Sequence, residues 1–397
     1  MHSNKGQCFS PKHFLRHPPQ NHGPKHITMK HFFSAKPAIS IFSILVALIG
    51  IGIIMIYSSS TIYAERYLGN RYYFLIRQLL HLVIGMIFLW FAVRYPYSNY
   101  KRLIPFLMIV SFVLMVLVLV PGIGKQVGNA RRWIRFFGIG IQPSEVLKFT
   151  LIVWVAGFLE RKKTVLGQFS QGLLPSLLMI AIFCFLLLLQ PDFGTSILIA
   201  LTLLTMIFVA GVKPFHMFGS VLGFLGISIL LVVSESYRMK RIFGFLDPWA
   251  DPLDAGFQLI QSLVAVGTGG ILGRDLGNSR QKLFFLPEGH TDFIFSILAE
   301  EAGFIGVTVV VGLLIYLMIK GFQVALHRPD DFGRNLAFGV TTMIILQSFL
   351  NIGVVIGLLP TKGIPLPFIS YGGSSLVMNI YMVGVLINIS KYGKKPI

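Results

Sequence analysis

Apolar stretches recur along nearly the whole chain, and most are as long as a helix must be to cross a membrane. A hydrocarbon layer of about 30 Å takes about 20 helical residues. The composition agrees, because 54% of the 397 residues are hydrophobic and only 12% are charged. Such a chain is not a soluble globular protein, and its sequence predicts an all-α integral membrane protein with ten transmembrane helices. We expect the spans at residues 39–59, 75–93, 103–121, 145–159, 173–190, 195–211, 217–233, 293–319, 335–359 and 374–390.

The distribution of lysine and arginine predicts which side of the membrane each loop occupies. Cytoplasmic loops are rich in these residues, and the loops after the even-numbered spans carry them here. Residues 1–36 are also basic and contain no aspartate or glutamate, which predicts a disordered cytoplasmic tail. Both termini are then cytoplasmic, and residues 37–397 form a single polytopic membrane domain. Its long extracytoplasmic loop, about 234–292, joins the seventh and eighth spans.

Two of the outward loops carry basic residues against this rule. Arg131 and Arg132 follow the third span, and Lys282 lies in the 234–292 loop. A long loop can cross the membrane regardless of its charge, so these residues need no function. Alternatively they bind an anionic ligand on the outer face, because guanidinium and ammonium groups suit phosphate. The formal net charge of +19 does not indicate a nucleic-acid partner, because the charges are dispersed among loops between spans.

Two further motifs place polar side chains at the starts of spans. Gln142-Pro-Ser-Glu145 begins the fourth span, where proline and an acidic residue suit the first helical turn. Lys148 lies about one turn further on, and we expect an intramembrane ion pair with Glu145. Helix capping alone would also explain the acidic residue. Asp192, between the fifth and sixth spans, is predicted to cap the sixth.

The stretch from Lys282 to Phe295 ends the long outward loop and begins the eighth span. Glu288, His290 and Asp292 lie at this junction, and ionisable residues at membrane depth usually mark a functional site. Asp292 has two interpretations. It could cap the eighth span. Alternatively, it could face a polar cavity, because Ser296, Ala299 and Glu300 lie on the same helix face and are small or polar.

A non-helical loop joins the last two spans. Residues 360–375 contain three prolines and two adjacent glycines, which prevent a regular helix. Irregular backbone at membrane depth is tolerated only where it is buried in protein or lines a water-filled cavity. Ser370, Tyr371 and Ser374 would supply hydroxyl groups to such a cavity.

Taken together, the motifs resemble the SEDS family of shape, elongation, division and sporulation proteins. The motifs that carry the resemblance are Asn129-Ala-Arg-Arg-Trp133, Gln142-Pro-Ser-Glu145, Gln190-Pro-Asp-Phe-Gly-Thr195, Leu286-Pro-Glu-Gly-His-Thr-Asp-Phe293 and Pro367-Phe-Ile-Ser-Tyr-Gly-Gly-Ser-Ser375. They occur in the family's order, and the resemblance runs from about residue 39 to the end. Lys362-Gly363 resembles the cell-division branch more than the elongation branch. Asp275 stands where the family has glycine, which puts an additional carboxylate near the expected anion site.

The resemblance implies a peptidoglycan glycosyltransferase that polymerises lipid II, a disaccharide-peptide on undecaprenyl pyrophosphate, during septal wall synthesis. The family's catalytic aspartate corresponds to Asp292, which as general base would take the proton of the acceptor sugar's 4-hydroxyl. Basic residues of the outer loops, with or without Mg²⁺ or Mn²⁺, would neutralise the departing pyrophosphate. The residues that we expect to bind the substrate are Arg131, Arg132, Lys282, Glu288, His290, Ser370, Tyr371 and Ser374.

The resemblance also implies a location and partners. The expected location is the bacterial inner membrane at the division septum, and the expected partners are a class B penicillin-binding protein and other divisome proteins. Two other functions fit the same features: a lipid II flippase and a non-catalytic divisome scaffold. The enzyme is favoured because the polar motifs concentrate on the outer face and because no inverted repeat of the kind found in many transporters is evident.

Overall fold

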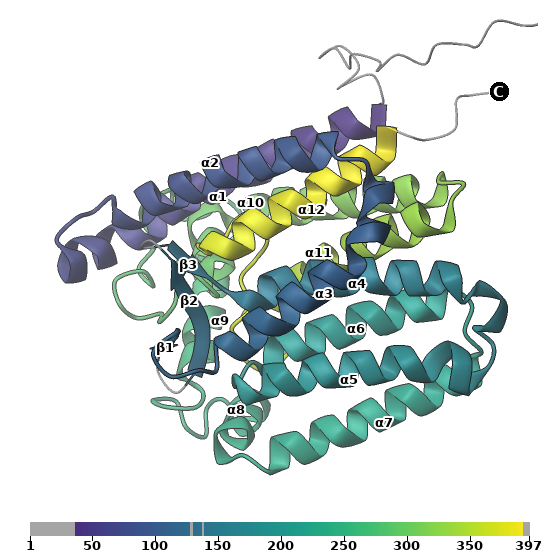
Figure 1. Ribbon diagram of the computed structural model, residues 1–397. Coiled ribbons are helices and arrows are strands. Elements are labelled where there is room, and N and C mark those ends of the chain that lie inside the picture. The colour runs from purple at the N-terminus through teal and green to yellow at the C-terminus, as the bar shows by residue number, and fades with distance from the viewer. Residues whose placement is uncertain (1–35, 128–129, 137–138, 392–397) are drawn as a thin grey trace, which may run out of the picture.

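The computed structural model describes residues 36–127, 130–136 and 139–391, which form a helical bundle with a small sheet at one end (Figure 1). The predicted cytoplasmic tail lies outside the described residues except for its last member. Within the described part, ten helices have 16 residues or more, and each coincides with one predicted span. They are α1 (Lys36–Leu68), α2 (Tyr73–Arg94), α3 (Tyr100–Leu117), α4 (Pro143–Arg161), α5 (Leu174–Leu189), α6 (Phe193–Val209), α7 (Pro214–Val233), α10 (Ile294–Leu326), α11 (Asp331–Val355) and α12 (Gly373–Lys391).

Shorter helical elements connect these long helices. Two of them, α8 (Ser236–Leu246) and α9 (Phe257–Gly269), lie in the 234–292 segment. The others are the 3₁₀ turns η2 (Tyr97–Asn99) and η3 (Lys163–Val165) and the single π-helical turn η4 (Phe169–Leu173). The segment that was predicted as one long outer loop therefore contains two helices.

Eight helices are long and apolar enough to cross a membrane, judged by length and composition over the described residues. The other two long helices are α6, which has only 17 residues, and α4, whose first turns contain Glu145 and Lys148. Most side chains of α4 are buried against other helices. A helix in the centre of a bundle contacts little lipid, so it tolerates polar side chains that a lipid-facing helix would not.

The centre of the bundle consists of α4, α11 and α12. In the apolar stretches of α11 and α12, 72% of the residues are buried, whereas only 6% are buried in that of α7. Small residues allow the closest helix contacts, as between α2 and α12. A Cβ atom on Gly384 would lie 2.8 Å from the Cβ of Ala92, so a larger residue would force these two helices apart.

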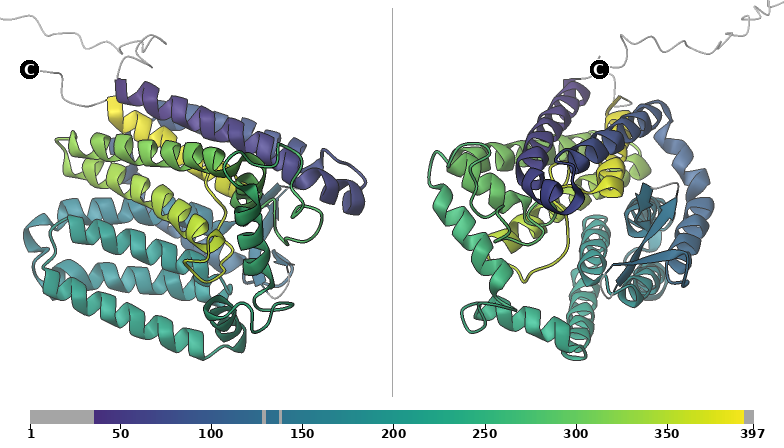
Figure 2. Two further views of the ribbon diagram at one scale, coloured as in Figure 1. Left: turned by 180° about the vertical axis from the view of Figure 1, so that it is seen from behind. Right: turned by 90° about the vertical axis from the view of Figure 1, so that its left-hand side faces the viewer.

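The two ends of the bundle differ in their content. The start of α1 and the end of α12 lie at one end, and the sheet, α8 and α9 lie at the opposite end (Figures 1 and 2). The described chain thus begins and ends at the same end of the bundle, and the side of the membrane on which that end lies stays a prediction. The segments that carry the predicted site lie together at the opposite end, where the sheet, α8 and α9 are found.

The segment after α3 forms a sheet that the sequence analysis did not predict. Its strands, β1 (Gly124–Val127), β2 (Ala130–Phe136) and β3 (Ile139–Ile141), are antiparallel in the order β1-β2-β3. The register passes from Gln126 opposite Arg131 to Lys125 opposite Trp133, so Arg132 is an additional residue in β2. Such a bulge redirects side chains and is common beside functional sites. The predicted all-α architecture therefore holds for the membrane-spanning helices but not for this segment.

The helix α10 is interrupted near its start. Gly303 has φ 62° and ψ −164°, so the helix consists of a short first part and a long second part. The preceding loop fills the break, because Arg274 N donates to Glu300 O at 3.0 Å and Phe304 N donates to Gly270 O at 2.9 Å. The backbone groups that the break exposes are thereby satisfied within the protein, as they must be at membrane depth.

Candidate active site

Asp292 lies just before α10 but does not cap it. The N-cap residue is Phe293, and no side chain makes a capping hydrogen bond there. The structure therefore argues against capping, the first of the two interpretations of Asp292. A carboxylate next to a helix start that is not used as a cap is available for another role.

Hydrogen bonds to the 360–375 loop hold the segment that carries Asp292. The amide Nδ2 of Asn351 donates to Asp292 O at 2.7 Å, and Ser370 Oγ donates to Thr291 O at 2.6 Å. Tyr371 N donates to His290 O at 3.0 Å. Asn351 was missed by the sequence analysis, although an amide within the last turns of an apolar span is itself a signal of a polar partner.

Burial, and to a smaller extent the nearby charges, set the pKa of Asp292. Burial raises the pKa of this carboxyl to about 7, and the negative charge of Glu288 contributes in the same direction. The guanidinium groups of Arg241 and Arg132 oppose the increase, and Asp192 adds to it. A carboxyl group whose pKa lies near neutral pH can both accept and release a proton, which suits a general base.

The two arginines whose charges act on Asp292 are fixed by backbone carbonyl groups. Arg132 Nε donates to Gln190 O at 3.1 Å, and its Nη2 donates to Pro191 O. Arg241 Nη1, on α8, donates to Thr361 O at 3.0 Å. A guanidinium group has five N–H donors, so these contacts orient it while others can bind an anion. Arg132 was predicted as a phosphate ligand from the sequence, whereas Arg241 was not.

Lys282 does not fit its predicted role. Its ammonium group is buried, with Nζ 2.9 Å from Glu301 Oε1 and 3.1 Å from Ser58 Oγ. A buried ion pair of this kind is costly to break, because either partner alone would leave an uncompensated charge. We therefore assign Lys282 to the structure of the loop rather than to phosphate binding. Arg131 lies on β2, with Nη2 3.5 Å from Gln126 Oε1.

The other two ionisable residues of the junction have different surroundings. Glu288 is exposed and has φ 55°, and its Oε2 accepts from Thr291 Oγ1 at 2.6 Å. The ring of His290 lies 4.5 Å from that of Phe74 and 6.1 Å from that of Tyr371. Burial lowers the pKa of His290, although the charge of Glu288 raises it. The imidazole is thus favoured in its neutral form, and it lies among aromatic rings.

Polar side chains at the starts of α4 and α6 make further contacts, and one of them, Asp192, also acts on the pKa of Asp292. Lys148 Nζ lies 2.7 Å from Glu145 Oε2, and both side chains are buried. Asp192 caps α6, since its Oδ1 accepts from Thr195 N at 3.3 Å.

Gln142 links Asp192 to Ser374 at the start of α12. Its Nε2 donates to Asp192 Oδ2 at 3.5 Å, and its N donates to Ser374 Oγ at 3.3 Å. Of the predicted hydroxyl groups, Ser370 thus contacts the segment of Asp292, whereas Ser374 contacts the start of α4.

The described residues contain no group of three or more histidine, cysteine or carboxylate side chains that could hold a metal ion by themselves. Magnesium ions, however, often bind through one or two carboxylates together with the phosphates of a substrate. Glu288, whose negative charge acts on Asp292, is an exposed carboxylate at this junction that could contribute to such a donor set.

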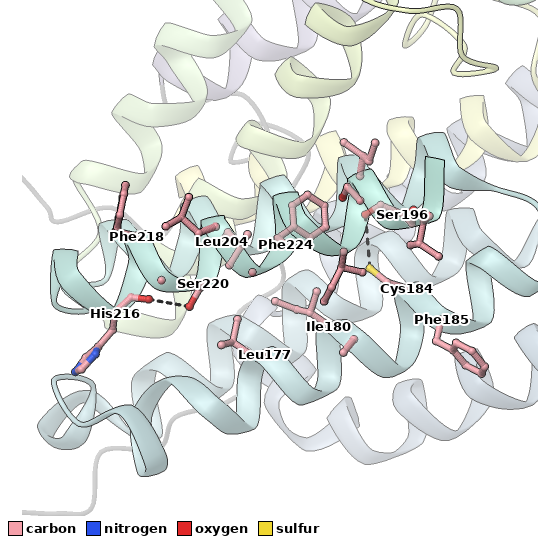
Figure 3. Close-up of a pocket in the computed structure, with 18 of the residues that line it drawn as sticks. Leu177, Ile180, Cys184, Phe185, Ser196, Leu204, His216, Phe218, Ser220 and Phe224 are labelled. Atoms are coloured by element: carbon pink, nitrogen blue, oxygen red, sulfur yellow. Dashed lines mark hydrogen bonds between the residues drawn. The ribbon is translucent and has the colours of Figure 1, made fainter. Parts of the chain in front are cut away.

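A large cavity lies between α5, α6 and α7, apart from this site (Figure 3). Its volume is about 1090 Å³, and aliphatic and aromatic side chains dominate its lining. Leu177, Ile180 and Phe224 are typical of that lining. None of the predicted substrate-binding residues lines it.

Comparison with known proteins identifies relatives over nearly the whole chain. A family model described as "Cell cycle protein", for FtsW, RodA and SpoVE, matches residues 39–395. A protein of Geobacter sp. (strain M18) named "Probable peptidoglycan glycosyltransferase FtsW" is 46% identical over 339 residues, 85% of this chain and 92% of that protein. "Stage V sporulation protein E" of Bacillus subtilis (strain 168) is 44% identical over 360 residues, 90% of this chain and 98% of that protein.

Solved structures with the same fold are also similar in sequence. One is described as "Structural coordination of polymerization and crosslinking by a peptidoglycan synthase complex". It has a TM-score of 0.74 and 28% identity, and the match covers 92% of this chain and 100% of that chain. The rod shape determining protein RodA of Thermus thermophilus has a TM-score of 0.66 and 26% identity, over 90% of this chain and 97% of that one. With a family match over most of its length and a relative 46% identical, this chain belongs to the SEDS family of cell-cycle proteins.

Proposed function

We propose that this protein is a peptidoglycan glycosyltransferase that polymerises lipid II, with release of undecaprenyl pyrophosphate, during septal wall synthesis. The observation that carries the proposal is the position of Asp292: a carboxyl group with a raised pKa, not used as a helix cap, beside two fixed arginines. The names of its relatives, which include a probable peptidoglycan glycosyltransferase, support the same activity.

The proposed reaction uses Asp292 as the base. Its carboxylate takes the proton of the acceptor sugar's 4-hydroxyl as that oxygen attacks the anomeric carbon of the donor sugar. The bond from that carbon to the pyrophosphate breaks, and the negative charge on the leaving group grows. Arg132 and Arg241 stabilise this charge, because fixed donors act more strongly in a site that excludes water. A Mg²⁺ or Mn²⁺ ion held by Glu288 together with the substrate phosphates would supply further neutralisation of that charge.

The membrane arrangement proposed for this reaction has ten spans, with α4 and α6 included. Both termini lie in the cytoplasm, and the 234–292 segment and the sheet lie outside, where the lipid-linked substrate presents its sugars. We propose the bacterial inner membrane at the division septum as the location. A class B penicillin-binding protein is the proposed partner, supported by the likeness to a structure from a peptidoglycan synthase complex.

Reconstitution tests this function. The purified protein is placed in liposomes with its transpeptidase partner and labelled lipid II, and glycan polymer and lipid II translocation are measured separately. We expect polymer that depends on the protein. Translocation without polymer would support a flippase instead, for which the buried Glu145–Lys148 pair inside the bundle would be the relevant feature. Neither product would indicate a scaffold.

A further inference from the structure

The outer end of the α1–α2 hairpin carries a cluster of aromatic side chains. The 33 residues of α1 span about 50 Å, which exceeds the hydrocarbon thickness of about 30 Å. Its last turns project past the other helices at the end where the sheet lies (Figure 1). Tyr63 and Tyr67, one turn apart on this projecting part, have ring centroids 4.8 Å apart.

The aromatic contacts continue from this cluster to the candidate active site. The ring centroid of Phe284, in the loop before α10, lies 5.7 Å from that of Tyr67. The ring centroid of Tyr63 lies 5.4 Å from that of His290, and the His290 ring in turn contacts the ring of Phe74. The rings thus form a continuous track from the tip of the hairpin to a residue two positions before Asp292.

The outer part of the track is accessible and carries a positive charge. The side chains of Tyr67, Tyr63 and Phe284 are 60%, 39% and 37% exposed. The guanidinium carbon of Arg66 lies 4.8 Å from the ring centroid of Phe284. Phe284 has φ 70°, which is unfavourable for a bulky residue and usually persists only where surrounding contacts impose it.

Exposed tyrosines near a membrane surface often form belts that face lipid headgroups. A belt spreads separate side chains around the protein, whereas these rings contact one another and adjoin His290. Continuity with the candidate active site therefore favours a ligand of that site over lipid.

We propose that Tyr63, Tyr67 and Phe284, together with Arg66, form a subsite that binds the glycan strand next to Asp292. The proposal rests on the glycosyltransferase function above. The faces of pyranose rings present C–H groups, which pack on aromatic rings, and tyrosine hydroxyl and arginine N–H groups can bond to sugar hydroxyl and acetamido oxygens. The guanidinium group also suits carboxylates of the peptide stems. By holding the strand between successive additions, the subsite increases the length of the product.

The direct test is binding of a soluble strand to the full-length protein in detergent. The probe is a lipid-free, fluorescently labelled hexasaccharide of the β-1,4-linked glycan, followed by anisotropy. We expect Tyr67→Ala and Phe284→Leu each to weaken binding by roughly three- to ten-fold. Trp249→Ala is the control, because Trp249 is an aromatic residue as exposed as Tyr67, at 68%, and lies in the same 234–292 segment as Phe284. This variant should bind the hexasaccharide like wild type. Unlabelled maltohexaose, with α-linkages, should not compete.

Product length provides a second readout. With lipid II as substrate, Tyr67→Ala should make shorter strands than wild type, and Tyr67→Phe, which keeps the ring, should fall between them. The subsite would be refuted by wild-type hexasaccharide affinity in both Tyr67→Ala and Phe284→Leu, or by an equal loss in Trp249→Ala. If Tyr67→Ala does not fold, Tyr67→Phe and Phe284→Leu decide by the same criteria. The binding assay needs no turnover, so a negative binding result would refute the subsite but not the proposed glycosyltransferase function. Conversely, a loss of polymerisation in other variants would not change the result of the binding assay.

Discussion

Arg241 and Glu288 act on Asp292 in opposite directions, and their effects on the pH dependence can be separated. A general base must be deprotonated, so polymerisation should increase as the pH rises through about 7, the pKa of Asp292, and then level off. Arg241→Gln removes a positive charge that lowers this pKa, so the midpoint should move to higher pH. Glu288→Gln removes a negative charge that raises it, so the midpoint should move to lower pH.

The measurement is the initial rate of polymerisation between pH 5 and pH 9 in reconstituted liposomes. Lys240→Gln is the control, because Lys240 is next to Arg241 in the sequence but pairs with Asp254 on the surface. Its midpoint should equal that of wild type. Shifts of the same sign in Arg241→Gln and Glu288→Gln would contradict the electrostatic account.

Single residues show where reasoning from sequence is sufficient and where it is not. The Glu145–Lys148 contact follows from helical spacing, and the structure contains it at 2.7 Å. Lys282 and Arg241 lie in the same long segment. Lys282 is buried against Glu301, whereas the charge of Arg241 acts on Asp292, and nothing in the local sequence predicts this difference. That difference arises from tertiary contacts, which spacing along the chain does not describe.

Asp275 illustrates a departure from the family that the backbone explains. The residue has φ 70°, a conformation in which glycine is unstrained and aspartate is among the more tolerated alternatives. The glycine expected at this position therefore has a conformational reason. The side chain of Asp275 is exposed.

At the scale of elements, the break in α10 connects the outer loop to Asp292. Glu300 accepts from Arg280 N at 3.0 Å and Glu301 pairs with Lys282, so the first part of the helix and the loop before it form one unit. Gly303 permits the break because its φ of 62° disfavours any other residue. The position of Asp292 relative to the bundle thus depends on this break.

Gly303→Ala should therefore destabilise the protein by about 1–3 kcal/mol. The added Cβ would lie 2.3 Å from Gly273 N, in addition to the backbone strain. Gly312→Ala is the matched control in the same helix, since nothing lies within 4 Å of its Cβ. That substitution should be neutral or stabilise the helix by about 0.5–1 kcal/mol. Melting temperatures in detergent distinguish the two, and equal values for both variants would contradict the account.

The elements that the sequence analysis missed are those with weak local patterns. The strands of the sheet have four, seven and three residues, and β2 contains three arginines, so no regular alternation of apolar and polar residues marks it. The break at Gly303 lies inside the predicted span 293–319, shortly after Glu300 and Glu301, and a glycine is common in membrane helices. Only the contacts with the preceding loop identify it as a break.

For the whole molecule, the positions of the long helices along the chain could be predicted because bilayer thickness sets a minimum length for a span. The order of packing could not, since lipid-facing and buried helices are both apolar. The buried position of α4 and the exposed position of α7 appear only in the structure. The orientation that we propose in the membrane rests on the basic loops and has a direct test.

Cysteine labelling tests that orientation. With Cys8 and Cys184 replaced by serine, Leu253→Cys places a thiol at a side chain that is 87% exposed in the 234–292 segment. Lys162→Cys places one in an exposed position after α4. A membrane-impermeant maleimide should label Leu253→Cys in intact spheroplasts and Lys162→Cys only after permeabilisation. The reverse pattern would show that the proposed topology is wrong.

The central claim is that Asp292 is the general base, and the most direct measurement is polymerisation of labelled lipid II by Asp292→Asn. The amide keeps the shape of the side chain but cannot accept the proton. Since Asp292 does not cap α10, melting temperature should be nearly unchanged. The account predicts a rate lower by about 10²–10⁴-fold with lipid II binding retained. A stable Asp292→Asn protein that polymerises lipid II at close to the wild-type rate would contradict it.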